Sequence, residues 1–294
     1  MQFFSYLING ISLGSVYALI ALGYTMVYGI AKMLNFAHGD VIMIGSYVVY
    51  FAFGASGLNP VLSIVLSMIV CTILGVVIER LAYRPLREAP SLAVLITAIG
   101  VSYLLQQVAQ LSWSSNPKSF TSVVSGMKPV SLFGGQLTIS AETIVTIVAC
   151  VVIMVVLMWF VNYTPAGHAM LAVSEDRGAA QLMGVNVNGT ISLTFAIGSA
   201  LAAIAGALLC SSYPTLQPTT GAMPGIKAFV AAVFGGIGSI PGAMVGGILL
   251  GVIEIFSKAY ISSQVADAIV FAVLIIVLLV KPSGLFGKNI QEKV

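Results

Sequence analysis

Residues 163–189 read YTPAGHAMLAVSEDRGAAQLMGVNVNG and interrupt a chain that is otherwise almost entirely apolar. The acidic and basic residues of this segment are Glu175, Asp176 and Arg177, which are adjacent. Long uncharged segments lie on both sides, and because such segments are stable in lipid as helices, we expect residues 163–189 to be an exposed loop between two membrane helices. Good helix formers within the loop predict one or two short helices. Such helices are suited to docking a soluble partner.

The composition predicts a membrane protein along the whole chain. Hydrophobic residues make up 59% of the 294 and charged residues 7%, against roughly 25% charged residues in soluble domains, and the mean hydropathy is +1.07. The net charge of +3 is small, and eight of the twelve lysines and arginines fall in loops assigned to the cytoplasm. The distribution of the basic residues therefore indicates how the chain is oriented in the membrane and gives no indication of a nucleic-acid partner. The three cysteines lie in apolar segments and are expected to be buried thiols rather than disulfides or metal ligands.

The order of apolar and charged segments predicts an all-α fold, a polytopic transmembrane helical bundle of about eight to ten spans. No charge precedes Lys32, which predicts a retained first helix with its N-terminus outside. Arg80, Arg84 and Arg87 assign the loop 79–90 to the cytoplasm, and an odd number of spans places the C-terminus inside. The nine expected spans are residues 1–31, a run ending near 53, 61–78, 91–111, 142–160, 190–209, 226–234, 244–260 and 267–280.

These spans form one transmembrane domain, 1–294, with a cytoplasmic loop at 163–189 and an extracytoplasmic loop at 112–140. The segment 226–234 is short for a bilayer, which needs about twenty helical residues, so we expect a half-helix or an extension by its flanks. Small residues at four-residue spacing predict close packing within the bundle, with contact to a second chain as the alternative. They are Gly10 and Gly14; Gly198, Ala202 and Gly206; Gly242 and Gly246; and Gly247 and Gly251.

Catalytic motifs are missing from the sequence. No Gly-rich phosphate loop of the form GxxxxGK[ST] is present, so the chain does not hydrolyse ATP by that route. The two histidines, His38 and His168, are far apart and have neither the carboxylate nor the cysteine spacing of a metal site. We therefore expect no enzyme activity, no metal and no cofactor, and transport is the remaining function of a chain with many spans.

A transported solute would pass the few polar groups at membrane depth. The candidates for the translocation path are Tyr24, Thr25, Asn35, His38, Asp40, Thr97 and Gln106. Each could instead bond to a neighbouring helix. Glu254 precedes Lys258 by four residues, which predicts a local ion pair near the outer interface, and we expect Lys227 to extend outward to the membrane surface.

Several runs along nearly the whole chain closely resemble one family. They include GISLGSVYALIALGYTMVYGI (10–30), NFAHGDVIMIGSY (35–47), AVSEDRGAAQLMGVNV (172–187) and IKAFVAAVFGGIGSIPGAMVGGILLGVIE (226–254). Together they resemble the LivH-type permease subunit of bacterial branched-chain amino acid ABC importers. The resemblance implies a multi-pass protein of the bacterial inner membrane, in contact with lipid. Its implied partners are a LivM-like second permease, two ATPase subunits that bind the ATP, and a periplasmic amino-acid-binding protein.

The resemblance also implies residue roles and a mechanism. The family's ATPase-coupling loop corresponds to the segment quoted first, at Glu175, Asp176, Arg177, Ala179, Ala180, Leu182, Met183 and Gly184. Here Leu182 and Met183 would enter a groove, with the three charges at its rim, and ATP hydrolysis in the partners would drive alternating access. The sequence departs most from the family's pattern in the loop 112–140. The binding protein would dock on this loop and on 213–224.

Two alternatives remain open from the sequence. Related systems import other amino acids, urea or short amides, so the substrate need not be leucine, isoleucine or valine. An ion-coupled secondary carrier or channel would instead use Asp40, His38 or Glu254 to bind a proton or a sodium ion. An intramembrane enzyme is disfavoured because catalytic groups are lacking.

Overall fold

The computed structural model describes residues 2–132 and 137–287 as a helical bundle with two small pairs of strands. The helices are α1 (Gln2–Ala31), α2 (His38–Val49), α3 (Pro60–Ile78), α4 (Ser91–Trp113), α5 (Ala141–Tyr163), α6 (Pro165–Glu175), α7 (Arg177–Leu182), α8 (Val187–Ser212), α9 (Ala222–Gly235), α10 (Ile240–Tyr260) and α11 (Ala266–Val280). The strands are β1 (Lys118–Ser119), β2 (Val130–Leu132), β3 (Leu137–Ile139) and β4 (Thr215–Leu216). The predicted all-α membrane bundle is confirmed.

Six of these helices are long and apolar enough to cross a membrane, namely α1, α3, α4, α5, α8 and α10. The apolar helices α9 and α11 are shorter, with 14 and 15 residues. The 12 residues of α2 continue into six residues of π-helix, Tyr50–Ala55. Within the described residues, these segments correspond to the nine expected spans. The short seventh span begins earlier than expected, at Ala222, yet at 1.5 Å per residue it remains shorter than a bilayer core of about 30 Å.

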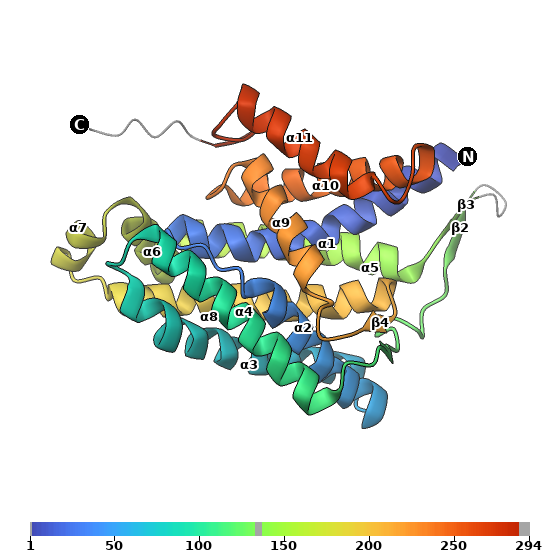
Figure 1. The fold of residues 1–294 in the computed structure, drawn as a ribbon, viewed down its shortest axis with the longest axis horizontal. Coiled ribbons are helices and arrows are strands. Elements are labelled where there is room, and N and C mark those ends of the chain that lie inside the picture. The colour runs from blue at the N-terminus through green and yellow to red at the C-terminus, as the bar shows by residue number, and fades with distance from the viewer. Residues whose placement is uncertain (1, 133–136, 288–294) are drawn as a thin grey trace.

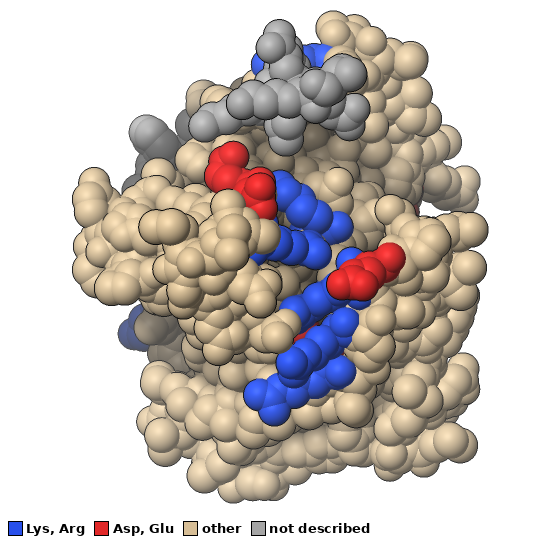
Figure 2. All heavy atoms as spheres, turned by 90° about the vertical axis from the view of Figure 1, so that its left-hand side faces the viewer, with Lys and Arg blue, Asp and Glu red and all other residues tan. Residues whose placement is uncertain are grey.

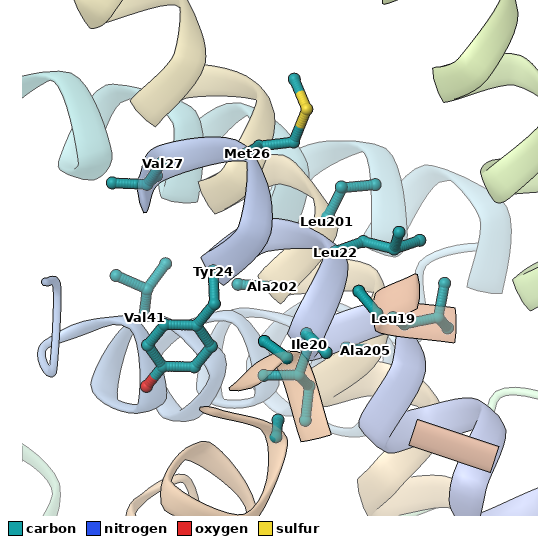
Figure 3. Close-up of a cluster of buried hydrophobic side chains, with 14 of the residues drawn as sticks. Leu19, Ile20, Leu22, Tyr24, Met26, Val27, Val41, Leu201, Ala202 and Ala205 are labelled. Atoms are coloured by element: carbon teal, nitrogen blue, oxygen red, sulfur yellow. The ribbon is translucent and has the colours of Figure 1, made fainter. Parts of the chain in front are cut away.

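Figure 1 shows α1 running through the middle of the bundle, with α8 and α2 on one side, α10 and α11 on the other, and α9 crossing it. The helix is apolar all round, which is typical of a helix surrounded by protein. Leu19, Ile20 and Leu22 are fully buried. In Figure 3 they lie in one cluster with Leu201 of α8 and Val41 of α2. The central position of α1 means that a movement of this helix would displace several spans at once.

The small-residue stripes pack against helices of this same chain. A Cβ placed on Gly251 of α10 would lie 2.2 Å from the backbone nitrogen of Gly14 on α1, and one on Gly247 would lie 2.5 Å from the Cα of Ala18. On its other face, Gly246 meets the carbonyl of Ala231 on α9 in the same way, at 2.2 Å. Such backbone contact is how helices associate in lipid, where no hydrophobic driving force exists between them. The prediction of close packing within one bundle is confirmed.

The two predicted outer loops are joined at the end opposite α6 and α7. Strand β1 pairs with β4, with Lys118 opposite Leu216, and the Phe120 amide donates to the Pro214 carbonyl at 3.2 Å. Strands β2 and β3 pair antiparallel, and residues 133–136 between them lie outside the described residues. The pairing of β1 with β4 thus joins the described parts of 112–140 to 213–224.

Candidate functional site

One end of the bundle carries α6, α7 and the loop that follows α3, and Figure 2 shows basic side chains gathered there beside a few acidic ones. The corner between α5 and α6 is rigid. The Thr164 hydroxyl caps α6 by accepting from the Gly167 amide at 3.0 Å, and Pro165 occupies the first turn. A Cβ on Gly167 would lie 2.3 Å from the Phe160 carbonyl oxygen, so a larger residue does not fit.

The short helix α7 has its own start and stop signals. Asp176 caps it, since its carboxylate accepts from the Ala179 amide at 2.9 Å. Ala180 is buried under the helix. Gly184 follows with φ +84°, a conformation that side-chain-bearing residues rarely adopt, and it ends the helix. Asn186 then caps α8 directly. Asp176, Ala180 and Gly184 therefore have structural roles in the loop, as a helix cap, a buried contact and a helix stop.

The exposed face of α7 ends in two large apolar side chains. Leu182 is 90% exposed and Met183 is 84% exposed, and adjacent exposed apolar residues of this size are typical of interaction sites. Glu175 is exposed nearby. Arg177 is only half-exposed. Its guanidinium turns inward and donates to the carbonyl of Ala31, the last residue of α1, because the carbonyls at a helix C-terminus lack partners and attract cations.

A buried carboxylate next to this end ties a second loop to α8. Glu79 is fully buried, pairs with the Arg87 guanidinium and accepts from the Ser192 hydroxyl at 2.6 Å. Arg87 also donates to Asn188. Partial burial and then the charge of Arg87 lower the pKa of the Arg177 guanidinium. Sequence reasoning used Arg87 only for orientation and missed Glu79. The sequence feature that could have indicated this buried ion pair is the position of Glu79 between an apolar span and three arginines.

Three of the predicted path residues are paired with polar groups. Gln106 on α4 donates to the Asp40 carboxylate at 2.8 Å, and the Tyr83 hydroxyl donates to the Asn35 side-chain oxygen at 2.9 Å. Asp40 and Asn35 are both buried. These contacts join α2 to α4 and the segment before α2 to the end of α3. They hold helices together, which is the alternative role considered for such groups.

Of the four other predicted path residues, three are buried and one is half-buried. Tyr24 meets His38 edge-on, with 4.7 Å between ring centroids, and both are buried. Thr25 is buried as well, whereas Thr97 is half-buried on α4. The cavity beside Tyr24 and Asn35 holds only about 10 Å³, room for about one water molecule. The region around Tyr24 and Asn35 is therefore closed within this chain.

Larger cavities lie toward the opposite end, where α5 begins and α8 ends. One of about 480 Å³ is lined by hydroxyls, including Ser12, Ser140 and Ser211, and by Glu142. A second of about 220 Å³ is lined by Lys227, Glu254 and Lys258 together with aliphatic residues. Leu13 and Tyr213 line both cavities, which are therefore neighbours. Sequence reasoning missed these sites, because serines and threonines at helix ends give no signal of which helices they face.

The expectation that Lys227 extends outward is wrong. Its side chain is 8% exposed and its Nζ lies 2.9 Å from Glu254 Oε1 and 2.7 Å from Asp267 Oδ1. Two carboxylates from α10 and α11 hold the ammonium inside, where it is paired rather than solvated. The predicted local pair is confirmed, since Lys258 Nζ lies 2.6 Å from the same Glu254 oxygen.

Comparison with known proteins shows to which family the chain belongs. Residues 6–278 match the family model described as branched-chain amino acid transport system / permease component. The chain belongs to this permease family. It is 44% identical over 305 residues to the high-affinity branched-chain amino acid transport system permease protein LivH of Salmonella typhimurium, an alignment that covers 100% of this chain and 98% of that protein.

Two further members of the family are similar over most of their length. The high-affinity branched-chain amino acid transport system permease protein BraD of Pseudomonas aeruginosa is 45% identical over 300 residues, which cover 98% of this chain and 97% of BraD. A probable branched-chain amino acid transport permease protein LivH of Methanocaldococcus jannaschii is 30% identical over 290 residues, with coverage of 92% and 88%. The resemblance seen in the sequence is confirmed: the chain is a multi-pass membrane permease whose relatives are transport proteins.

Proposed function

We propose that this permease is one membrane subunit of an ATP-driven importer that moves branched-chain amino acids into the cytoplasm. A LivM-like second permease completes the path, two separate ATPase subunits bind and hydrolyse the ATP, and a periplasmic amino-acid-binding protein supplies the substrate. The assembly resides in the bacterial inner membrane, with α6 and α7 on the cytoplasmic side. The observation that carries this proposal is the α7 surface, where Leu182 and Met183 are exposed beside a contact to the central helix.

The geometry of α7 suits a coupling device. Two adjacent apolar side chains on a short helix are suited to a hydrophobic groove of a partner. Because Arg177 bonds to the carbonyl of Ala31, a push on α7 acts directly on the end of α1. Because only a few residues separate Leu182 from Val187, where α8 begins, the same push acts on α8. Of the six long apolar helices, α1 and α8 are the most deeply buried. Moving them as rigid bodies would reopen the closed region around Tyr24.

The opposite end suits substrate delivery. The paired strands β1 and β4 join the described parts of 112–140 to 213–224, which together offer a surface for the binding protein. The cavities of about 480 and 220 Å³ lie beneath that end and would receive the released substrate. Branched-chain amino acids are the substrates favoured by the relatives' names, with other amino acids, urea or short amides as the alternatives that the assay below separates.

The test is purification of the detergent-solubilised permease after expression with its native neighbours. We expect a second permease and an ATPase subunit to co-purify, and ATP hydrolysis to rise when a leucine-loaded binding protein is added. Urea or acetamide in place of leucine tests the alternative substrates. A chain that purifies alone and moves solute in response to an ion gradient would contradict the proposal and support the secondary carrier.

A further inference from the structure

A buried ion cluster joins four helices at the delivery end. Glu254 of α10 is 1% exposed and its Oε1 accepts from Lys227 of α9 and from Lys258. Its Oε2 accepts from the Tyr17 hydroxyl of α1 at 2.8 Å, and Asp267 of α11 completes the cluster through Lys227. Lys227 and Glu254 are buried, with side chains 8% and 1% exposed, whereas Lys258 and Asp267 reach the surface, at 38% and 44%. Desolvating the two buried ions costs several kcal/mol per ion, which paired contacts only offset. Ionisable groups held at such cost inside a membrane protein mark functional sites more often than structural ones.

The cluster forms one wall of the cavity of about 220 Å³. Its charged lining residues are Lys227, Glu254 and Lys258, and its aliphatic ones include Leu13, Leu209 and Met223. The remaining lining is mostly hydroxyl-bearing: Tyr17, Tyr213, Thr215 and Thr220. This volume is below the roughly 300–1,000 Å³ typical of pockets for drug-sized ligands. The cavity therefore suits a small ligand that has a charged end and a short aliphatic end.

Unused hydrogen-bonding capacity defines the charged end of that ligand. Each ammonium has three N–H donors. Among the described residues, Lys227 uses two of them, on Glu254 and Asp267, and Lys258 uses one, on Glu254. A carboxylate accepts about four hydrogen bonds, and Glu254 accepts three, the third from Tyr17. The wall thus retains donors for a carboxylate and one acceptor for an ammonium group.

We propose that this cavity is a transit site for a zwitterionic aliphatic amino acid, whose carboxylate binds Lys258 and Lys227 and whose ammonium group binds Glu254. The aliphatic side chain then lies against Leu13 and Leu209. The cluster itself is neutral, with two lysines, one glutamate and one aspartate. A zwitterion preserves that neutrality, whereas a singly charged ligand would add an uncompensated charge beside Glu254, which is 1% exposed. This inference rests on the proposed function, because it assigns the substrate a site in the same importer.

Protection of an engineered thiol tests the site without requiring transport. Met223 is 44% exposed and lines the cavity, so Met223→Cys should react with a maleimide in the purified complex. The native thiols Cys71, Cys150 and Cys210 are fully buried and give a low background. We expect L-leucine to slow the labelling, and leucinamide, which has the same side chain and amino group without the carboxylate, to leave it unchanged. Met127→Cys, a matched methionine on the outer loop with 63% exposure, should be indifferent to leucine.

A second variant tests the carboxylate contact. Lys258→Met leaves Glu254 paired with Lys227 and Tyr17, so the helices stay connected. Losing one charge-assisted hydrogen bond should raise the leucine concentration needed for protection about 10- to 100-fold, while Lys258→Arg should retain most of the protection. Equal protection in Lys258→Met and the parent, equal protection by leucinamide, or no protection by leucine would each overturn the inference.

The two proposals fail separately. ATP-driven leucine uptake without protection at residue 223 would refute this site and leave the importer intact. Protection by leucine in a chain that ATP does not energise would refute the importer and leave the site.

Discussion

Replacing Leu182 and Met183 with aspartate should separate this permease from its ATPase subunit. At 90% and 84% exposure both side chains are almost fully available to a partner. Burying a side chain of this size contributes about 1.5–3 kcal/mol, so the pair contributes about 3–6 kcal/mol to the interface. Since each 1.4 kcal/mol changes an equilibrium constant tenfold, binding should weaken by about two to four orders of magnitude. The fold should be unaffected, because exposed substitutions usually change stability by less than about 0.5 kcal/mol.

The assay is retention of the ATPase subunit on the tagged permease, followed by leucine uptake in proteoliposomes. Leu58→Asp with Ile261→Asp is the matched control, because these residues are also exposed, at 43% and 67%, and lie in connecting segments toward the other end. We expect the control to retain the ATPase and the α7 variant to lose both the ATPase and uptake while remaining in the membrane. Normal uptake by the α7 variant would refute the assignment of the coupling surface.

Three further predictions concern the bundle and the coupling contacts. Gly251→Ala should destabilise the protein by about 1–3 kcal/mol, because the new Cβ would lie 2.2 Å from the backbone of α1. Gly100→Ala is the control: its Cβ meets nothing within 4 Å, so the change should be neutral or slightly stabilising. Thermal melts in detergent compare the two, and equal melting temperatures would contradict the packing argument. Glu79→Gln should lower stability by about 3–5 kcal/mol by breaking a buried ion pair, and an unchanged melting temperature would show that the pair is dispensable. Arg177→Gln should retain the ATPase but lower the leucine transported per ATP hydrolysed, since α7 loses its bond to the end of α1; an unchanged ratio would exclude that route of transmission.

The spans were predictable because each is a continuous apolar run bounded by polar or charged residues. The expected 142–160 became Ala141–Tyr163, and 91–111 became Ser91–Trp113, shifts of no more than three residues at helix ends. The loop 163–189 holds the two short helices that its composition favoured, because the capping threonine and aspartate lie within the segment itself. Local signals of this kind are readable from one stretch of chain.

Contacts between distant segments were not predictable in the same way. Lys227 was expected to extend outward, because its partners lie on α10 and α11 and nothing in its own helix indicates them. The burial of Glu79 depends on Ser192, 113 residues away. The pairing of β1 with β4 involves two residues in each strand, which is too short for a hydropathy pattern. Each case depends on which segments become neighbours in the fold.

Leucine uptake into proteoliposomes that hold the permease with its co-purified subunits tests the central claim most directly. With ATP enclosed in the vesicles and the leucine-loaded binding protein outside, permeases whose α6–α7 end faces the vesicle interior should accumulate leucine against its gradient without any ion gradient. We predict that accumulation requires hydrolysable ATP and stops when Leu182 and Met183 are replaced with aspartate. Accumulation driven by a proton or sodium gradient, without ATP and without the ATPase subunit, would contradict the account.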